Sequence, residues 1–332
     1  MSLERKKGEQ MARIDGFGIG IRFYSTVTVK QIDWLWQPYI PYGKVTVIQG
    51  DPGDGKTTLI LSIAAMLSTG QAMPESLQAP ACSNVIYQSA EDGAEDTIKP
   101  RLIAAGADCE KVAFIDETNE FLTLDSPRIE QAIRDADAKL LVIDPLQAYL
   151  GDGSEMNRAE GVRPLMRSLT NVAERTGCAI VIIGHMNKGS GTKGIYRGLG
   201  SIDISASARS VLLVARLRDN PEVRVLAQIK NSFAREGPAL AFEIRHGTGI
   251  HWLGEYEISA AELLTGKTPD NSGKSTLAAS ILLSVLGEGP MTSCEIYEKM
   301  QAQDISKRTA DAAKKKLDVH SKKIGDTWYW SL

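Results

Sequence analysis

The sequence predicts an α/β fold with a mostly parallel central sheet, followed by a small helical domain near the carboxyl end. Short apolar segments of strand length alternate with helical patterns between about residues 45 and 214. The strands then come closer together, at residues 223–229 and 240–244, which indicates antiparallel strands at one edge of the sheet. Between these segments, expected helices occupy residues 94–105, 128–136 and 159–175, and a further strand is expected at residues 112–115.

A glycine-rich segment joins the first strand, residues 45–49, to an apolar helical pattern at residues 59–67. Its residues have the G-x-x-x-x-G-K-[ST] spacing of a phosphate-binding loop, the P-loop: Gly50, Asp51, Pro52, Gly53, Asp54, Gly55, Lys56, Thr57 and Thr58. Glycines let the backbone wrap closely around an anion, and the following helix adds its positive N-terminal end. We expect Lys56 to contact the β- and γ-phosphates and Thr57 to bind Mg²⁺. A glycine-rich turn that matches by chance is the alternative.

Two carboxylates follow buried strands, where a parallel sheet gathers its functional groups. Asp144 ends the apolar strand at residues 140–143, and we expect it to hold Mg²⁺ through water. Pro145 comes next, so no glutamate stands beside Asp144 to activate water. Glu91, just past the strand at residues 85–88, is the expected base. Asp92 could be confused with it, and a helix-capping role for the acid is the alternative.

His185 and Arg209 are less specific on their own. His185 follows the buried strand at residues 179–183, where a neutral imidazole can contact a γ-phosphate; a histidine satisfied within a loop is the alternative. Arg209 precedes the apolar strand at residues 210–214, and taken alone it could be a surface arginine.

The order of the motifs GDPGDGKTT, SAEDG, LLVIDP, IIGHMNK and RGLGS, after the lead-in WQPYIPYGK, resembles the RecA-like P-loop ATPases. Within them it is similar to the RepA-type hexameric replicative helicases of plasmids and phages, over residues 31–255. The resemblance implies ATP and Mg²⁺ as cofactors and a ring of identical subunits. It also implies the following roles: nucleotide and Mg²⁺ binding for Lys56 and Thr57, catalytic base for Glu91, second acid for Asp144 and γ-phosphate sensor for His185.

The same resemblance implies two residues at the subunit interface. Arg209 falls where family members present an arginine finger to the neighbouring subunit, and such fingers are worth about 10³ to 10⁵ in rate. Lys230 matches a second basic position there. DnaB-type helicases often carry a K-x-R pair at this place, but Ser232 takes the arginine position here and Arg235 is only nearby. A finger supplied in trans would make the protein an obligate oligomer for hydrolysis.

Composition is compatible with these expectations. The chain has 332 residues, which indicates one large or two unequal domains, and a net charge of −3, so any contact with nucleic acid must be local. Four cysteines are scattered without a C-x-x-C motif, which fits a reducing cytoplasm. No apolar run approaches the ~18 residues of a membrane span. Residues 1–30 are charged at the start, lack a signal-peptide pattern and are expected to form a leader.

Two loops are candidates to line a central pore and contact single-stranded DNA. The loop at residues 151–158 is acidic and suits this role poorly. The loop at residues 188–197 suits it better, because it combines glycines with Tyr196 for stacking and with three cations for phosphates: Lys188, Lys193 and Arg197. An ordinary solvated loop is the alternative.

After an expected linker at residues 256–275, the composition changes. The Gly-Lys-Ser-Thr at residues 273–276 is no second P-loop, since no apolar strand precedes it. Residues 276–332 predict three helices and a terminal hairpin, with a capping box from Thr292 to Glu295 and a cap at Ser306, as in a winged helix-turn-helix. Residues 305–323 hold seven basic and two acidic residues, a net charge of +5. Duplex DNA contacts are expected from Lys307, Arg308, Lys314 and Lys315; protein docking is the alternative.

The sequence thus predicts a cytoplasmic, oligomeric, Mg²⁺-dependent ATPase that acts on DNA, of the replicative helicase type found in plasmids, phages or prophages. Two alternatives remain open: a recombination or repair ATPase of the RadA kind, and a non-motor ATP-dependent regulator of replication or transcription. A kinase-like enzyme for a small substrate is disfavoured by the C-terminal domain.

Overall fold

The computed structural model describes residues 23–76, 78–151, 159–185, 202–218, 220–245, 247, 249–265, 272–287, 289–303, 305–325 and 327–331. The expected DNA contacts Lys188, Lys193 and Arg197 lie outside the described residues, as does almost all of the loop at residues 151–158. The chain divides into two units, Met1–Asp33 and Trp34–Leu332. The described part of the first unit contains one 3₁₀ turn, Tyr24–Thr26.

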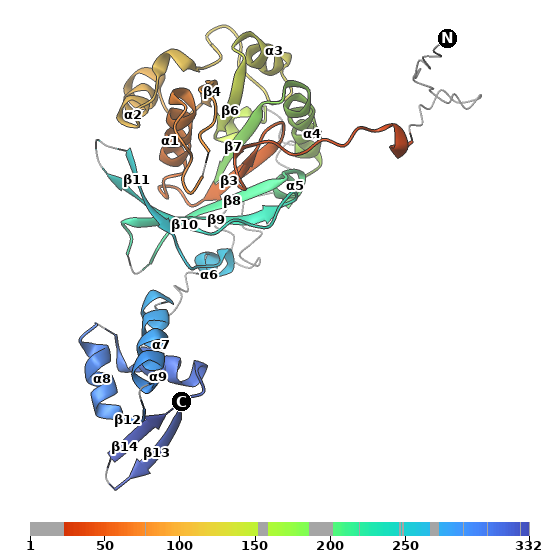
Figure 1. Cartoon of the computed structure of the whole chain (residues 1–332). Coiled ribbons are helices and arrows are strands. Elements are labelled where there is room, and N and C mark those ends of the chain that lie inside the picture. The colour runs from red at the N-terminus through yellow and green to blue at the C-terminus, as the bar shows by residue number, and fades with distance from the viewer. Residues whose placement is uncertain are drawn as a thin grey trace, which may run out of the picture. The chain divides into compact units, whose positions relative to one another are not determined.

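A nine-stranded sheet forms the centre of the second unit, in the order β11-β10-β9-β8-β3-β7-β6-β4-β5 (Figure 1). Six neighbouring strands, from β8 to β5, are parallel, and β9 to β11 add an antiparallel edge. This confirms the expected α/β fold. The strands are β3 (Val45–Gly50), β4 (Asn84–Ser89), β5 (Val112–Ala113), β6 (Ala138–Asp144), β7 (Ala179–His185), β8 (Ser210–Arg216), β9 (Val223–Asn231), β10 (Leu240–Arg245) and β11 (Gly249–Glu255).

Helices cover both faces of the sheet, because its central strands are apolar on both sides. The helices α1 (Lys56–Thr69) and α2 (Lys99–Ala104) lie on one face, and α3 (Pro127–Asp135) and α4 (Ala159–Thr176) lie on the other (Figure 1). The short helix α5 (Ile202–Ser207) joins the second group through Ile204. The helix expected at residues 94–105 opens with a wide π-helical turn, Ala94–Ile98, before α2.

Strand β5 is shorter than the four residues expected. The backbone N–H of Ile115 donates to Oε1 of Gln88 at 2.9 Å, and Nε2 of Gln88 donates to the Ile115 carbonyl at 3.2 Å. A side-chain amide from the neighbouring strand therefore takes the place of the ladder bonds at Ile115, and the regular pairing ends at Ala113.

The α/β domain extends beyond its expected end at residue 255. Tyr256 donates its backbone N–H to the Ala239 carbonyl at 2.8 Å, and α6 (Ala260–Thr265) follows. Leu263 of this helix is buried in an apolar cluster with Leu213 and Val223 of the sheet. The first half of the expected linker is thus packed structure, a result of apolar residues at 258, 260, 263 and 264.

The C-terminal elements have a separate apolar core, formed by α7 (Ser272–Gly287), β12 (Met291–Thr292), α8 (Ser293–Gln301), α9 (Lys307–Lys316), β13 (His320–Ile324) and β14 (Thr327–Ser331). The three strands form an antiparallel sheet in the order β12-β14-β13. The capping box at Thr292 and Glu295 is confirmed, and Ser306 caps α9. Helix α9 ends at Lys316, shortly before Asp318 adopts a φ of 53°. None of the described helices combines the length and apolar character that crossing a membrane requires.

Candidate functional site

The carboxyl ends of the central parallel strands lie side by side at one end of the sheet. Gly50 at the end of β3 pairs with His185 at the end of β7, and Ser89 at the end of β4 pairs with Asp144 at the end of β6. The same end of the sheet therefore holds the P-loop, Asp144, the segment that carries Glu91 and the backbone of His185. The side chain of His185 is outside the described residues.

The P-loop glycines are required by neighbouring strands as well as by the turn itself. Gly55 has a φ of 94°, a conformation that disfavours a side chain. A Cβ there would also lie 2.5 Å from Cδ1 of Ile244 on β10. At Gly50 a Cβ would collide with the carbonyl oxygen of Val214 on β8. The motif is thus packed closely against β8 and β10.

Lys56 is buried, with 4% of its surface exposed, at the start of α1. Its Nζ donates to the carbonyls of Gly50 at 2.8 Å and Asp51 at 2.9 Å. Burial lowers the pKa of Lys56, and the nearby carboxylates of Asp54 and Asp144 partly offset this effect. An ammonium has three donors, so these two carbonyls fix its position while leaving it able to bind an anion.

Asp144 receives two hydrogen bonds on one oxygen. The Thr57 hydroxyl and the Tyr87 hydroxyl each donate to Oδ2 of Asp144 at 2.8 Å. Burial raises the pKa of Asp144, although both hydrogen bonds act in the opposite direction. Burial, together with the Asp144 charge, raises the pKa of Tyr87 well above its usual value.

The residues present fit Mg²⁺, which prefers oxygen ligands and keeps several waters when it binds with substrate phosphates. Thr57 and Asp144 supply a hydroxyl and a carboxylate that already lie within hydrogen-bond distance of each other. Over the described ranges, no group of three or more His, Cys, Asp or Glu residues could hold a metal ion. Phosphate oxygens and waters would have to complete the coordination here.

The structure distinguishes Glu91 from its neighbour. Asp92 forms an ion pair with Arg101 at 3.0 Å, and its backbone N–H donates to Oγ of Ser89. Glu91 is exposed, and its charge acts on Lys56; besides burial, the charges of Asp92 and Glu91 both raise the pKa of Asp144. The backbone N–H of Ala90 donates to the Asp144 carbonyl at 3.1 Å, which ties this turn to the end of β6.

Arg209 and Lys230 lie at the opposite end of the strands from the P-loop, where β8 begins. The backbone N–H of Arg209 donates to the carbonyl of Val45, the first residue of β3, and its side chain is exposed. Nζ of Lys230 donates to the carbonyls of Ser205 at 3.1 Å and Ala206 at 2.9 Å, so it stabilises the last turn of α5. Neither residue reaches the P-loop of its own chain, because the length of β3 separates them from it.

Sequence reasoning missed two arginines beside the P-loop. Arg216, the last residue of β8, donates from Nη2 to the Gly53 carbonyl, and its Nε lies 3.6 Å from Oδ1 of Asp54. Oδ2 of Asp54 accepts the backbone N–H of Asp51 at 3.0 Å, which closes the loop. Arg224 pairs with Arg216 across the β8–β9 ladder and packs beside Gly55, and burial lowers its pKa. Only the ladder register reveals these arginines.

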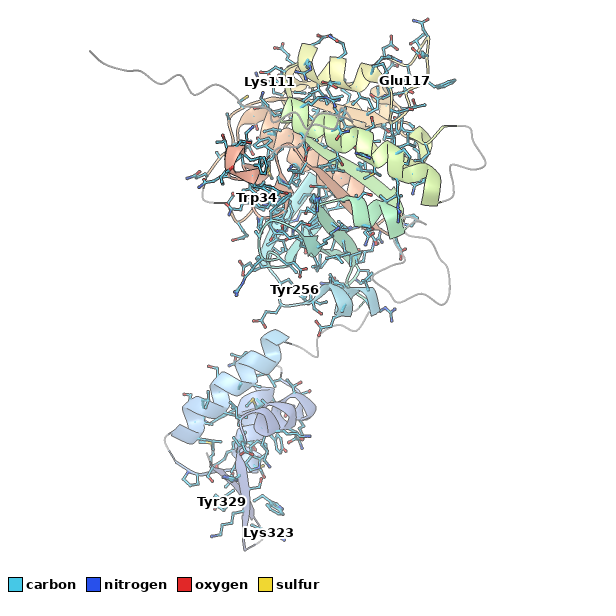
Figure 2. All side chains as sticks on the ribbon, turned by 90° about the vertical axis from the view of Figure 1, so that its right-hand side faces the viewer. Trp34, Lys111, Glu117, Tyr256, Lys323 and Tyr329 are labelled. Atoms are coloured by element: carbon cyan, nitrogen blue, oxygen red, sulfur yellow. The ribbon has the colours of Figure 1, made fainter. Side chains whose placement is uncertain are left out.

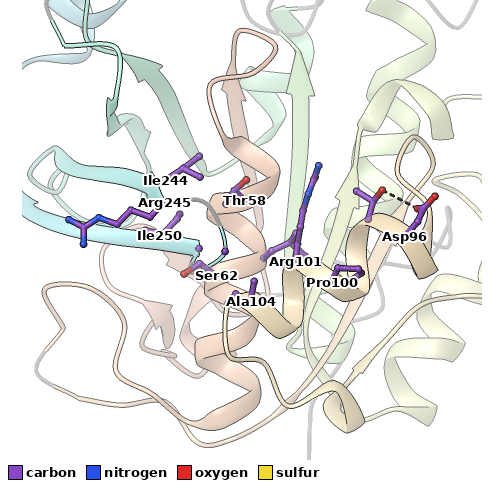
Figure 3. Close-up of a pocket in the computed structure, with 14 residues that line it drawn as sticks. Thr58, Ser62, Asp96, Pro100, Arg101, Ala104, Ile244, Arg245 and Ile250 are labelled. Carbon is purple, nitrogen blue, oxygen red and sulfur yellow. Dashed lines mark hydrogen bonds between the residues drawn. The ribbon is translucent and has the colours of Figure 1, made fainter.

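A cavity of about 460 Å³ opens next to the P-loop, between α1, α2 and the β10–β11 hairpin (Figure 3). Its lining combines apolar and polar groups, among them Thr58, Ser62, Arg101, Ala104, Ile244 and Ile250. Thr58 directly follows the expected Mg²⁺ ligand Thr57, so the cavity begins where the phosphate-binding segment ends.

Comparison with known proteins gives curated relatives and a solved structure. Over 222 residues the chain is 30% identical to the DNA repair protein RadA of Halalkalibacterium halodurans, covering 66% of this chain and 43% of that protein. Over 243 residues it is 27% identical to the DNA repair protein RadA of Bacillus subtilis, covering 72% and 46%. The match thus spans less than half the length of these relatives. A KaiC-like protein from Pyrococcus horikoshii has a TM-score of 0.48 and 20% identity, over 64% of this chain and 90% of that one.

The family model described as AAA domain matches residues 21–191, just over half of the 332 residues. The matched segment contains the P-loop, Glu91, Asp144 and His185, and it ends before Arg209. The chain therefore belongs to the AAA domain family.

Proposed function

We propose that the protein is a Mg²⁺-dependent ATPase that works on DNA as an oligomer. The observation that carries this proposal is a buried lysine, Lys56, held by the P-loop carbonyls, next to Thr57, whose hydroxyl donates to the buried Asp144. A cation, a hydroxyl and a carboxylate held together beside backbone N–H groups match what a nucleotide triphosphate with Mg²⁺ requires. Membership of the AAA domain family supports the same function.

The residues would divide the work as follows. Lys56 and the P-loop N–H groups bind the β- and γ-phosphates, while Thr57 and Asp144 hold Mg²⁺. Bound Mg²⁺ neutralises charge on the phosphate oxygens. Glu91 orients the attacking water and accepts its proton, a role for which Asp92 is less suited because Arg101 already pairs with it. His185, the last residue of β7, pairs with Gly50 at the start of the P-loop, and we assign it the role of γ-phosphate sensor.

The cavity beside Thr58 is our candidate for the nucleoside part of ATP. A pocket with apolar walls and a few polar groups suits a base and ribose. Ile244, Ile250 and Ala104 would contact the base, and the guanidinium of Arg101 offers a planar surface for stacking. Because Arg101 also pairs with Asp92, it would connect the base pocket to the segment that carries Glu91.

We infer that hydrolysis occurs between subunits. Arg209 is exposed at the end of the strands opposite the P-loop, so it can serve only the site of another copy. Lys230 would act in the interface by fixing the end of α5 beside Arg209, rather than by contacting the nucleotide of its own chain.

The DNA-directed part of the proposal rests on the relatives and on the C-terminal elements. The two reported relatives are named DNA repair proteins, which favours a RadA-like repair or recombination ATPase over the RepA-type helicase. The C-terminal order helix, strand, helix, helix, strand, strand matches a winged helix-turn-helix. The hexameric helicase remains the second candidate on the order of its motifs.

Phosphate release from ATP, measured with and without single-stranded DNA on protein sized by light scattering, tests the proposal. We expect a Mg²⁺-dependent rate that DNA increases and that grows with the oligomeric fraction. A forked duplex separates the two candidates, because only the helicase unwinds it. A rate that neither Mg²⁺ nor DNA changes, on monomeric protein, would contradict the proposal.

A further inference from the structure

We propose that the terminal β13–β14 hairpin, rather than helix α9, forms a binding surface for single-stranded nucleic acid, with Trp328 as the ring on which a base stacks. This inference rests on the proposed DNA-directed function and assigns the surface that carries out the contact. It relocates the expected site, because the lysines of α9 were expected to contact duplex DNA.

Two of the lysines expected to bind DNA are engaged within their own domain. Nζ of Lys314 lies 4.3 Å from the ring centroid of Trp330 and donates to Oγ of Ser321. Nζ of Lys307 lies 5.1 Å from the ring centroid of Tyr297. The Tyr297 and Trp330 rings meet edge to face at 5.4 Å, and Trp330 is 3% exposed. These lysines therefore cover the aromatic core of the domain.

The hairpin presents the opposite arrangement. Trp328 is 50% exposed, although tryptophan is usually well buried. It pairs directly with the exposed Lys323, and the next pair along the ladder joins the exposed Lys322 to Tyr329. Lys323 and Tyr329 lie on this hairpin in Figure 2. The open indole ring of Trp328 and the Lys323 side chain thus lie side by side on one face of the hairpin, while Lys322 lies on the other face.

This combination suits a single strand better than a duplex. Base–aromatic stacking needs an unstacked base, and Lys323 beside the ring can contact a phosphate next to the stacked base. The stacked bases of a duplex offer no open face on which the Trp328 ring could stack. Since stacking accepts every base, the surface should bind with little sequence preference, and DNA and RNA strands share the required chemistry.

The test uses the full-length protein without nucleotide and the anisotropy of labelled 20-residue dT and rU strands and a blunt duplex. We expect Trp328→Ala to weaken single-strand binding about 5- to 150-fold, the equivalent of one lost stack. Trp328→Phe should retain most of the affinity. Lys323→Gln should lower the slope of log affinity against log salt by roughly 0.7, for one lost phosphate contact on a single strand. Lys299→Gln, an exposed lysine on α8, is the matched control and should bind as wild type.

Binding of either strand with this dependence supports the inference, and the tighter one identifies the natural ligand as DNA or RNA. Wild-type affinity in both Trp328→Ala and Lys323→Gln would overturn it, as would a preference for the duplex that these changes leave intact. Binding of an acidic peptide but of neither strand would assign the surface to a protein partner instead. Phosphate release without DNA should be the same in all variants. If the protein binds single strands through Trp328 but hydrolyses no ATP, the proposed ATPase function is wrong and the proposed strand-binding surface stands.

Discussion

The Thr57 hydroxyl donates a hydrogen bond of 2.8 Å to Oδ2 of Asp144, a residue 87 positions further along the chain. This contact joins the first turn of α1 to the end of β6 and places two expected Mg²⁺ ligands side by side. Tyr87 donates to the same oxygen from β4, so three elements converge on one carboxylate. The site is therefore organised by the protein itself.

Asp144→Asn should weaken Mg²⁺ binding without destabilising the fold. Burial raises the pKa of Asp144 in the folded chain, so its ionised form lowers stability above that pKa, and the cost disappears as pH falls through it. The asparagine carbonyl can still accept from Thr57 and Tyr87. We expect a melting temperature at pH 7 equal to or above that of wild type, a difference that shrinks in acid, and about 10- to 100-fold weaker apparent Mg²⁺ affinity.

Melting curves at several pH values and Mg²⁺ titrations of phosphate release check this prediction. Asp135→Asn, on the exposed surface of α3, is the control and should leave the Mg²⁺ requirement unchanged. A large fall in melting temperature at pH 7, with the Mg²⁺ requirement kept, would show that Asp144 has only a structural role.

Glu91→Gln should bind ATP with near-normal affinity but lose about 10²- to 10⁴-fold in turnover, the usual contribution of a general base. Asp92→Asn should have a smaller effect, since it removes a partly exposed ion pair with Arg101. Single-turnover hydrolysis and fluorescent-nucleotide binding measure both, with the exposed Glu95→Gln as the control. The reverse ranking, with Asp92→Asn the inactive variant, would move the base by one residue.

Arg216→Gln should raise the KM for ATP about tenfold and change kcat less, because it loses charge-assisted contacts that shape the P-loop. In an Asp54→Asn background the same change should have little further effect, since the two side chains act as a pair. Steady-state kinetics of the double-mutant cycle test this, and Arg218→Gln, exposed just past β8, is the control. Fully additive effects would mean that Arg216 and Asp54 act separately.

Arg209→Ala should reduce hydrolysis by about 10³- to 10⁵-fold, the range measured for arginine fingers. Mixing it with Glu91→Gln subunits should restore part of the activity, because an interface that takes its site from an Arg209→Ala subunit and its finger from a Glu91→Gln subunit combines an intact Glu91 with an intact Arg209. Arg235→Ala, exposed after β9, is the control and should be active alone. Phosphate release from mixtures that never exceeds that of the separate variants would exclude a contribution in trans.

Features set by local pattern were predictable from the sequence. The P-loop has a motif of fixed spacing, and Asp144 and Glu91 follow apolar strands whose ends must meet in a parallel sheet. Contacts that depend on which strands become neighbours could not be predicted from the sequence. Tyr87 reaches Asp144 because β4 pairs with β6 in a register that puts both on the α1 face. Arg216 reaches Gly53, 163 residues away, because β8 lies beside β3.

The shortened β5 and the packed helix α6 have the same origin. Gln88 read as an ordinary strand residue, and only the fold shows that its amide takes over the pairing of Ile115. Residues 256–265 lack a strong periodic pattern, and their apolar side chains gain a partner only once β8 and β9 form the antiparallel edge. The bond of Lys230 to α5 is likewise a long-range contact without a local signal.

Calorimetric titration of a nonhydrolysable ATP analogue with Mg²⁺ into wild-type protein and Lys56→Ala tests the central claim most directly, with Lys44→Ala, a lysine at the other end of β3 from the P-loop, as the control. The account predicts one analogue bound per chain in wild type and Lys44→Ala, and at least about 100-fold weaker binding in Lys56→Ala, because a buried cation that contacts the phosphates is lost. Equal affinity in Lys56→Ala, or no binding by the wild-type protein, would contradict it.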